Sequence, residues 1–97
     1  MRIRYTRPAI ADLEAVLAGI SSHSPKGARR VQSRVQTFIE LLADHPFIGA
    51  RTDDPSIRRL PIPPYPYLIF YEVVGDEVII HTVRHAARDP SSMPGSG

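Results

Sequence analysis

The sequence predicts an α+β fold in which a helical hairpin packs on a mostly antiparallel sheet, in the order β-αα-βββ. Two observations predict it. Apolar side chains recur at helical spacing through the neighbouring segments 8–20 and 25–44, which a short turn joins. The segments before and after them, 2–6 and 67–84, have strand character, and a Gly-Asp pair divides the second into a hairpin.

Length and composition indicate one small globular domain, which we place at residues 1–90, followed by a flexible C-terminal tail at 91–97. The 97 residues are 42% hydrophobic and 23% charged, and none is cysteine. Disulfides and thiolate metal sites are therefore excluded. A formal net charge of +2 is too small for a protein that binds DNA on its own. No apolar run is long enough for a membrane span, so we expect a cytoplasmic protein with no membrane association.

The first three elements follow from simple patterns. Residues 2–6 alternate in polarity, as a half-buried strand does. Pro8 stands where a first helix can begin, and Ser24-Pro25 reads as the N-cap and first residue of a second helix. His45-Pro46 ends that helix, because proline disfavours the helical conformation of the residue before it. Two amphipathic helices joined by a short turn form an antiparallel hairpin.

The second half of the chain is predicted as a loop followed by three strands. Residues 47–56 are rich in turn formers and are expected to be a loop. A strand at about 57–62 should be short and lie at a sheet edge, because the prolines around it cannot donate ladder hydrogen bonds. The strands 67–74 and 77–84 pair through a turn at Gly75-Asp76. Both faces of this hairpin are apolar in the middle, so we expect a loop, the tail or another protein to cover the face that the helices leave open.

Few residues in this chain suit catalysis. No glycine-rich phosphate loop is present, and the serines cluster in turns and in the tail. His81 and His85 are four apart on a predicted strand, so we expect them to share a face about 13 Å apart, too far for one metal ion. We therefore expect neither a metal nor a cofactor.

One cluster remains, at the exit of the last strand, where Arg84, His85 and Arg88 follow one another closely. A histidine beside arginines suits acid–base work on a phosphodiester, with arginine stabilising the developing negative charge. Arg58 and Arg59, on a neighbouring predicted strand, could gather on the same sheet. The alternative is a solvated rim in which Arg88 pairs locally with Asp89 and His85 caps the sheet.

Over about residues 2–90 the order of motifs resembles the RelE/ParE superfamily of bacterial type II toxin–antitoxin toxins. The resemblance rests on "AIADL" at the first helix, "SPKGARRV" at the start of the second and "HPFIGAR" after it. It continues through "IRRLPIPPYPYLIFYEV" and ends on "VIIHTVRHAARDP". Each piece is short, and it is their order that is specific. The resemblance implies the RelE-like two-layer fold, which agrees with the periodicity.

The superfamily divides by target. RelE-like members are ribosome-dependent endoribonucleases that cut mRNA, whereas ParE-like members inhibit DNA gyrase. Arg88 falls where the RelE pattern places its last arginine, and Arg58 and Arg59 stand near its lysine positions. Leu68 occupies the position of another expected arginine, and no tyrosine follows Arg88. A nuclease that lacks its general acid, its general base and the positive charges that stabilise the phosphate loses several powers of ten in rate, because such groups act as a unit.

The resemblance therefore favours a ParE-like toxin that binds DNA gyrase, with Arg58, Arg59, Arg84, His85 and Arg88 as candidate target-binding residues. The alternative is a RelE-like nuclease acting on mRNA in the ribosome, with Arg58, His85 and Arg88 as candidate catalytic residues. A third interpretation is a domain that binds its antitoxin and has lost toxicity. All three imply a small cognate antitoxin as partner, with a C-terminal segment that folds over the toxin.

Overall fold

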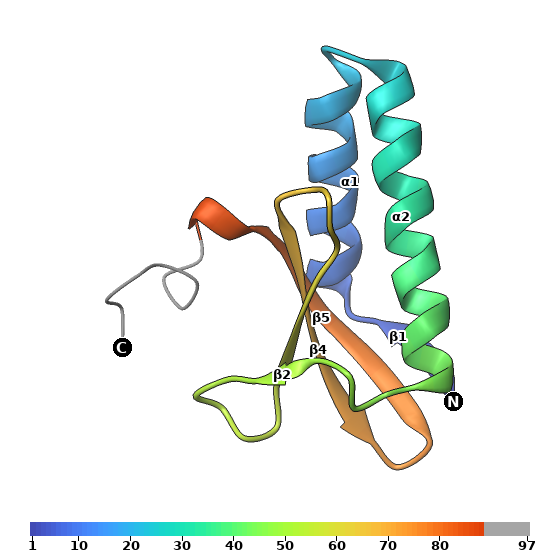
Figure 1. Cartoon of the computed structure of the whole chain (residues 1–97), viewed down its shortest axis with the longest axis vertical. Helices are drawn as coiled ribbons and strands as arrows, with labels where there is room; N and C mark the ends of the chain where they lie inside the picture. Colours follow the sequence, from blue (N-terminus) through green and yellow to red (C-terminus); the bar gives the residue numbers. More distant parts are fainter. Residues whose placement is uncertain (89–97) are drawn as a thin grey trace.

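A computed structural model describes residues 1–88, and the tail expected at 91–97 lies outside the described residues. Two helices pack on a five-stranded sheet with the strand order β1-β5-β4-β3-β2 (Figure 1). The predicted α+β fold class is therefore confirmed. The elements in chain order are β1 Arg2–Tyr5, α1 Arg7–Ser21, α2 Pro25–Asp44, β2 Ala50–Arg51, β3 Arg58–Pro61, β4 Tyr67–Val74, β5 Glu77–His85 and the 3-10 helix η1 Ala86–Arg88.

Side-chain caps fix where both helices begin. The hydroxyl of Thr6 accepts from the backbone N–H of Ala9 at 3.1 Å, so Thr6 is the cap of α1 and not the last residue of the first strand. Ser24 caps α2 in the same way, accepting from Gly27 N–H at 3.0 Å, and Pro25 is the first helical residue as predicted. The second helix ends at Asp44, just before His45-Pro46.

The hairpin of β4 and β5 forms the middle of the sheet. Gly75 has φ +59°, a conformation that glycine adopts without strain, and it turns the chain between the two strands. The bounds of β4 are those predicted, and β5 continues one residue further than predicted, to His85. Every neighbouring pair is antiparallel except β1 and β5, which run parallel.

The predicted loop 47–56 contains a strand that the sequence pattern does not reveal. Ala50–Arg51 forms β2 and pairs with the first half of β3, through Ala50–Arg59 and Arg51–Arg58. The strand near 57–62 is therefore short but is second from the edge, which corrects the prediction. The physical reason is that β2 needs to pair with only two residues of β3, and these precede Pro61. Turn-forming residues around so short a strand hide it from pattern analysis.

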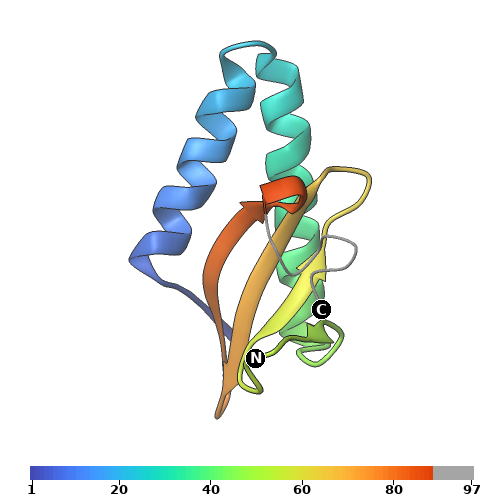
Figure 2. The same cartoon turned by 90° about the vertical axis from the view of Figure 1, so that its left-hand side faces the viewer.

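The core lies between the helical hairpin and one face of the sheet, which we call the helix face. It is built on fully buried side chains of the central strands, with the apolar stripe of α2 packed against them. The other face, which we call the open face, carries no helix (Figure 2). The most deeply buried large side chains are Tyr71, Leu42, Ile62, Ile69, Ile80 and Val78.

The apolar residues in the middle of the open face are largely buried, although no helix covers this face. Leu68 and Ile79 point to this face, yet only 5% and 6% of their surfaces are exposed. Long side chains of neighbouring strands explain this: the register partners of Ile79 are Arg4 and Glu72. The highly exposed large apolar side chains lie mostly elsewhere, at Met1, Ile10, Leu41, Phe47, Ile48 and Val74.

Candidate functional site

A β-bulge brings together two polar side chains on the open face. The register between β4 and β5 shifts between Phe70 and Tyr71, which leaves His81 as an extra residue on β5. The Nε2 atom of His81 lies 2.9 Å from Oε1 of Glu72, and the two side chains are 35% and 27% exposed, respectively. When the Glu72 carboxylate accepts the Nε2 proton, Nδ1 is the nitrogen left to accept another. The pair thus has the form of a base held in one orientation by a carboxylate.

His85 lies on the opposite face from His81, so the expectation that the two histidines share a face is wrong. His85 pairs with Tyr67 across the strands, and their rings meet edge to face with centroids 5.4 Å apart. Tyr67 packs against the core, which places both rings on the helix face. The bulge is the cause, because one extra residue inverts the alternation of side chains along a strand.

Arg58 belongs to the helix face and contacts the loop after α2. Its guanidinium donates to the backbone carbonyls of Phe47, at 3.2 Å, and Gly49, at 2.8 Å. It also stacks over the Phe47 ring, 5.2 Å from the centroid. Gly49 N–H in turn donates to the hydroxyl of Tyr71 at 2.8 Å. Arg58 and Tyr71 therefore fix one loop between them.

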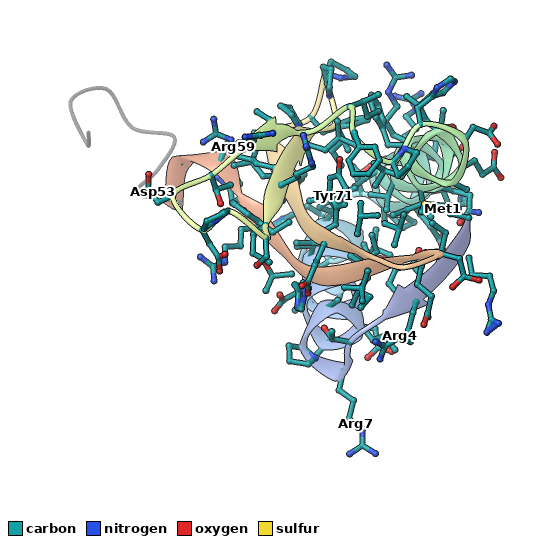
Figure 3. All side chains as sticks on the ribbon, turned by 90° about the horizontal axis from the view of Figure 1, so that it is seen from below. Met1, Arg4, Arg7, Asp53, Arg59 and Tyr71 are labelled. Atoms are coloured by element: carbon teal, nitrogen blue, oxygen red, sulfur yellow. The ribbon has the colours of Figure 1, made fainter. Side chains whose placement is uncertain are left out.

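Arg59 and Arg84 lie on the open face, on two sides of Phe70. Arg59 is the register partner of Phe70, and the Arg84 guanidinium lies 5.6 Å from the centre of its ring. Figure 3 shows Arg59 and Tyr71 pointing to opposite sides of the strands. Phe70 and Glu72 are two residues apart on β4, so the Arg59–Arg84 pair and the His81–Glu72 pair occupy neighbouring parts of one face, about 7 Å apart along the strand.

The exit of β5 forms one wall of a cleft on the helix face. Ala87 N–H donates to Nδ1 of His85 at 3.1 Å, which leaves Nε2 of that ring for other contacts. Arg88 follows in η1. The cleft has a volume of about 680 Å³ and lies between the second half of α1 and the ends of β4 and β5. Its lining residues are Asp12, Ala15, Val16, Gly19, Ile20, His23, Ser24, Tyr67, Val83, Arg84 and His85.

The walls of this cleft are mostly apolar, and the cleft is open on the side of α1. A side chain added at Gly19 would meet nothing within 4 Å, so the cleft has room for another backbone there. The carboxylate of Asp12 accepts from Val83 N–H at 3.3 Å and ties α1 to β5 at the floor. The helical hairpin reaches beyond the end of the sheet, which leaves its upper turns uncovered by strands (Figures 1 and 2).

Four of the candidate residues predicted from sequence, Arg58, Arg59, Arg84 and His85, do not come together at one point. Arg59 and Arg84 share the open face, whereas Arg58 and His85 occupy the helix face on different strands. Among residues 1–88, no group of three or more histidine and carboxylate side chains could hold a metal ion. No helix within this part of the chain is long and apolar enough to cross a bilayer.

Sequence reasoning missed the His81–Glu72 pair. The two positions are nine apart in the sequence, and their contact depends on the register of a hairpin that contains a bulge. Near them, Asp54 carries a pKa below its usual value, because the hydroxyl and backbone N–H of Ser56 donate to its carboxylate. The signal that could have indicated the pair is the turn at Gly75-Asp76, which makes Glu72 and Ile79 register partners and places His81 two residues beyond.

Known proteins resemble this chain over most of its length. A family model described as ParE toxin of type II toxin-antitoxin system, parDE, matches residues 3–90. Toxin RelE2 of Caulobacter vibrioides is 38% identical over 87 residues, covering 90% of this chain and 97% of its own length. The Y4kP protein of Sinorhizobium fredii is 36% identical over 85 residues, with 88% of each chain covered.

A solved structure gives the same result for the fold. A chain of the chromosomal ParDE TA system from P. aeruginosa superposes with a TM-score of 0.77 and 23% identity, covering 88% of this chain and 95% of its own. The family model and the sequence relatives define the protein as a toxin of a type II toxin–antitoxin system. Within that class the chain belongs to the ParE toxin family, part of the RelE/ParE superfamily.

Proposed function

We propose that this toxin arrests growth in the cytoplasm by binding DNA gyrase, and that a cognate antitoxin neutralises it. The observation that carries the proposal is the match of residues 3–90 to the ParE family model. The placement of Arg58 adds support, because its guanidinium is engaged by two backbone carbonyls and an aromatic ring. Such an arginine contributes to the shape of a binding surface and has little freedom to act on a phosphodiester.

Supercoiling by purified gyrase tests the target. We expect the purified toxin to inhibit supercoiling in a concentration-dependent way, or to trap cleaved DNA on the enzyme. Prior addition of the antitoxin should restore supercoiling, which controls for non-specific inhibition. Supercoiling that stays at its full rate when the toxin concentration saturates antitoxin binding would reject gyrase as the target.

We propose that the antitoxin segment binds in the cleft between α1 and β5. Three features support this site: its volume of about 680 Å³, its mostly apolar walls, and the open space above Gly19. Small residues at the wall let a second backbone approach closely, as an amphipathic helix in an apolar groove does. His85 at the rim can contact the polar end of such a segment. The toxin alone should then be less stable than the complex.

The second candidate function is a RelE-like ribosome-dependent endoribonuclease, and the His81–Glu72 pair favours it. With Glu72 holding the Nε2 proton, His81 could take the proton of a ribose 2′-hydroxyl through Nδ1. The 2′-oxygen would then attack the adjacent phosphorus and expel the 5′-oxygen, which takes a proton from solvent. Arg84 on the same face could stabilise the charge on the phosphate. The products would be a 2′,3′-cyclic phosphate and a 5′-hydroxyl end.

Primer extension on translated mRNA distinguishes the two functions. A nuclease should produce cuts that need ribosomes and that disappear in His81→Ala. His85→Ala is the matched control, because that histidine lies on the other face of the sheet. Translated mRNA that remains uncut with the wild-type toxin would eliminate this candidate.

A further inference from the structure

Two large apolar side chains stand exposed directly after α2. Phe47 is 62% exposed and Ile48 is 44% exposed, and Leu41 on the last turns of α2 is 39% exposed. Phe47 and Ile48 also line a shallow pocket of about 390 Å³ at the C-terminal end of α2. Scattered exposed apolar residues are ordinary, but neighbouring ones on one side of a small protein mark an interaction site.

The backbone that carries Phe47 is held in place by the interior. Arg58 donates to the carbonyls of Phe47 and Gly49 and stacks on the Phe47 ring. Gly49 N–H donates to the buried hydroxyl of Tyr71. An exposed aromatic on a backbone fixed in this way loses little conformational freedom when a partner binds, which is the property of interface residues that dominate affinity.

The same side of α2 becomes basic toward its N-terminal end. Arg34 is seven residues before Leu41 and stacks on Phe38, 5.3 Å from the ring centre. Its Nε donates to the carbonyl of Pro63, which holds the guanidinium beside the helix. Arg30 is four residues earlier and exposed. Helical spacings of three and four align these side chains on one side of α2. We call the resulting surface the α2 flank: Arg30, Arg34, Phe38, Leu41, Phe47 and Ile48.

The two acidic residues in the second half of α2 differ in their relation to this surface. Glu40 is six residues after Arg34, so the helical period of about 100° per residue turns it about 120° away from that arginine. Glu40 also accepts from the amide of Gln36. Asp44 is three residues after Leu41 and lines the shallow pocket together with Phe47 and Ile48. The α2 flank is therefore positively charged toward its N-terminal end, and its other end is apolar with the single carboxylate of Asp44 beside it. It is also separate from the cleft, which α1 and β5 line.

We infer that the α2 flank is the surface with which the toxin binds its target, and that it accepts an amphipathic helix with acidic residues at one end. Carboxylates of the partner helix would meet Arg30 and Arg34, and its apolar side chains would pack on Leu41 and Phe47. From Arg30 to Leu41 the flank is about 16 Å long, enough for three turns of a partner helix. The inference rests on the proposed function, in that it supposes a protein target distinct from the antitoxin.

The experiment compares matched variants of the full chain for growth arrest after induction and for affinity toward the antitoxin. Phe47→Ala and Ile48→Ala test the apolar end, with Ile10→Ala as control, since Ile10 on α1 is 46% exposed. Arg30→Glu tests the basic end, with the neighbouring Arg29→Glu, which points about 100° away, as control. Melting temperatures of all variants identify any that fail to fold, and Ile48→Ala leaves the Arg58–Phe47 stack intact.

We expect the three flank variants to require roughly tenfold more toxin for the same arrest, the cost typical of one interface anchor. Their antitoxin affinity and the behaviour of both controls should equal wild type. Folded flank variants that arrest growth like wild type would overturn the inference, as would flank variants that lose antitoxin affinity and stay toxic. If the wild-type toxin arrests growth but does not inhibit gyrase, gyrase is rejected as the target. The growth assay of the flank variants would still test whether the α2 flank binds another target. Wild type that arrests nothing would reject both.

Discussion

Gly49 donates its backbone N–H to the hydroxyl of Tyr71 at 2.8 Å, and the ring of Tyr71 fills the space where a side chain at position 49 would lie. This contact joins the loop after α2 to the centre of β4. It gives the oxygen of a fully buried phenol a hydrogen-bond donor, and it fixes the chain two residues after Phe47. One buried hydrogen bond thus connects the core to the exposed surface that we infer to bind the target.

Substitution of Gly49 by alanine should destabilise the protein. A Cβ at this position would lie 2.6 Å from the Tyr71 hydroxyl oxygen and 2.7 Å from a ring carbon, so the ring or the loop has to move. We expect a loss of about 1–3 kcal/mol in the free energy of unfolding, measured by urea titration. Gly19→Ala is the control: nothing lies within 4 Å, and a gain of up to about 1 kcal/mol is expected in a helix. Equal stabilities of the two variants would contradict the close approach.

The stability of the protein should fall at alkaline pH, with Tyr71 as one cause. Burial raises the pKa of Tyr71, more than its hydrogen bond from Gly49 and the nearby Arg58 lower it. Because the folded state favours the neutral phenol, this contribution is complete below the unfolded pKa of about 10. It is lost as the pH rises through the raised folded pKa. Burial also raises the pKa of Tyr5, which acts in the same direction.

The variant Tyr71→Phe isolates the contribution of Tyr71 to the loss of stability at alkaline pH. At neutral pH the variant leaves Gly49 N–H without its acceptor and should lose about 1–3 kcal/mol of unfolding free energy. Its further loss between about pH 8 and 11 should be smaller than that of wild type, and Tyr5 accounts for part of what remains. An unchanged alkaline slope in Tyr71→Phe would show that Tyr71 does not titrate with folding.

The hydroxyl of Thr82 is buried without a hydrogen-bond partner among residues 1–88. Thr82→Val has nearly the same shape and removes the unsatisfied group, so we expect it to stabilise the protein by about 1 kcal/mol. Thr6→Val is the matched control, because that hydroxyl caps α1 and donates to the carbonyl of His81 at 3.0 Å. It should lose about 1 kcal/mol. Thermal denaturation of both variants shows whether each substitution raises or lowers the stability of the protein.

Local patterns were sufficient to predict most of the fold. The caps at Ser24 and the stop at His45-Pro46 depend on neighbours within four residues, and the turn at Gly75 depends on one glycine. The sequence pattern did not predict the strand β2, because its two residues form a strand only by pairing with β3, eight residues further along the chain. The parallel pairing of β1 with β5 likewise joins opposite ends of the domain.

The site was less predictable for the same reason. The arginines and His85 were found by residue type, but which face each one occupies depends on register. The bulge at Phe70–Tyr71 sends His81 to the open face and leaves His85 on the helix face. The role of Arg58 as a support for the Phe47 loop depends on two carbonyls nine and eleven residues away, which no spacing rule indicates.

The antitoxin should lose affinity when the cleft is filled from the α1 side. Gly19→Leu places a side chain in space where nothing lies within 4 Å, so the fold should tolerate it and the helix should gain slightly in propensity. Within the cleft, the same side chain occupies the position that a partner backbone would take. We expect antitoxin binding to weaken by tenfold or more, on the order of 1.4 kcal/mol, in isothermal titration calorimetry.

Ala18→Leu is the control for that substitution, because Ala18 is exposed on the same turn of α1 and does not line the cleft. Gly19→Leu should also remain as toxic as wild type, since the α2 flank is untouched, and the antitoxin should protect cells from it poorly. Full protection of cells expressing Gly19→Leu, with calorimetric affinity equal to that of Ala18→Leu, would place the antitoxin outside the cleft. The combination of retained toxicity with lost protection is what two separate surfaces require, because a single shared surface would lose both together.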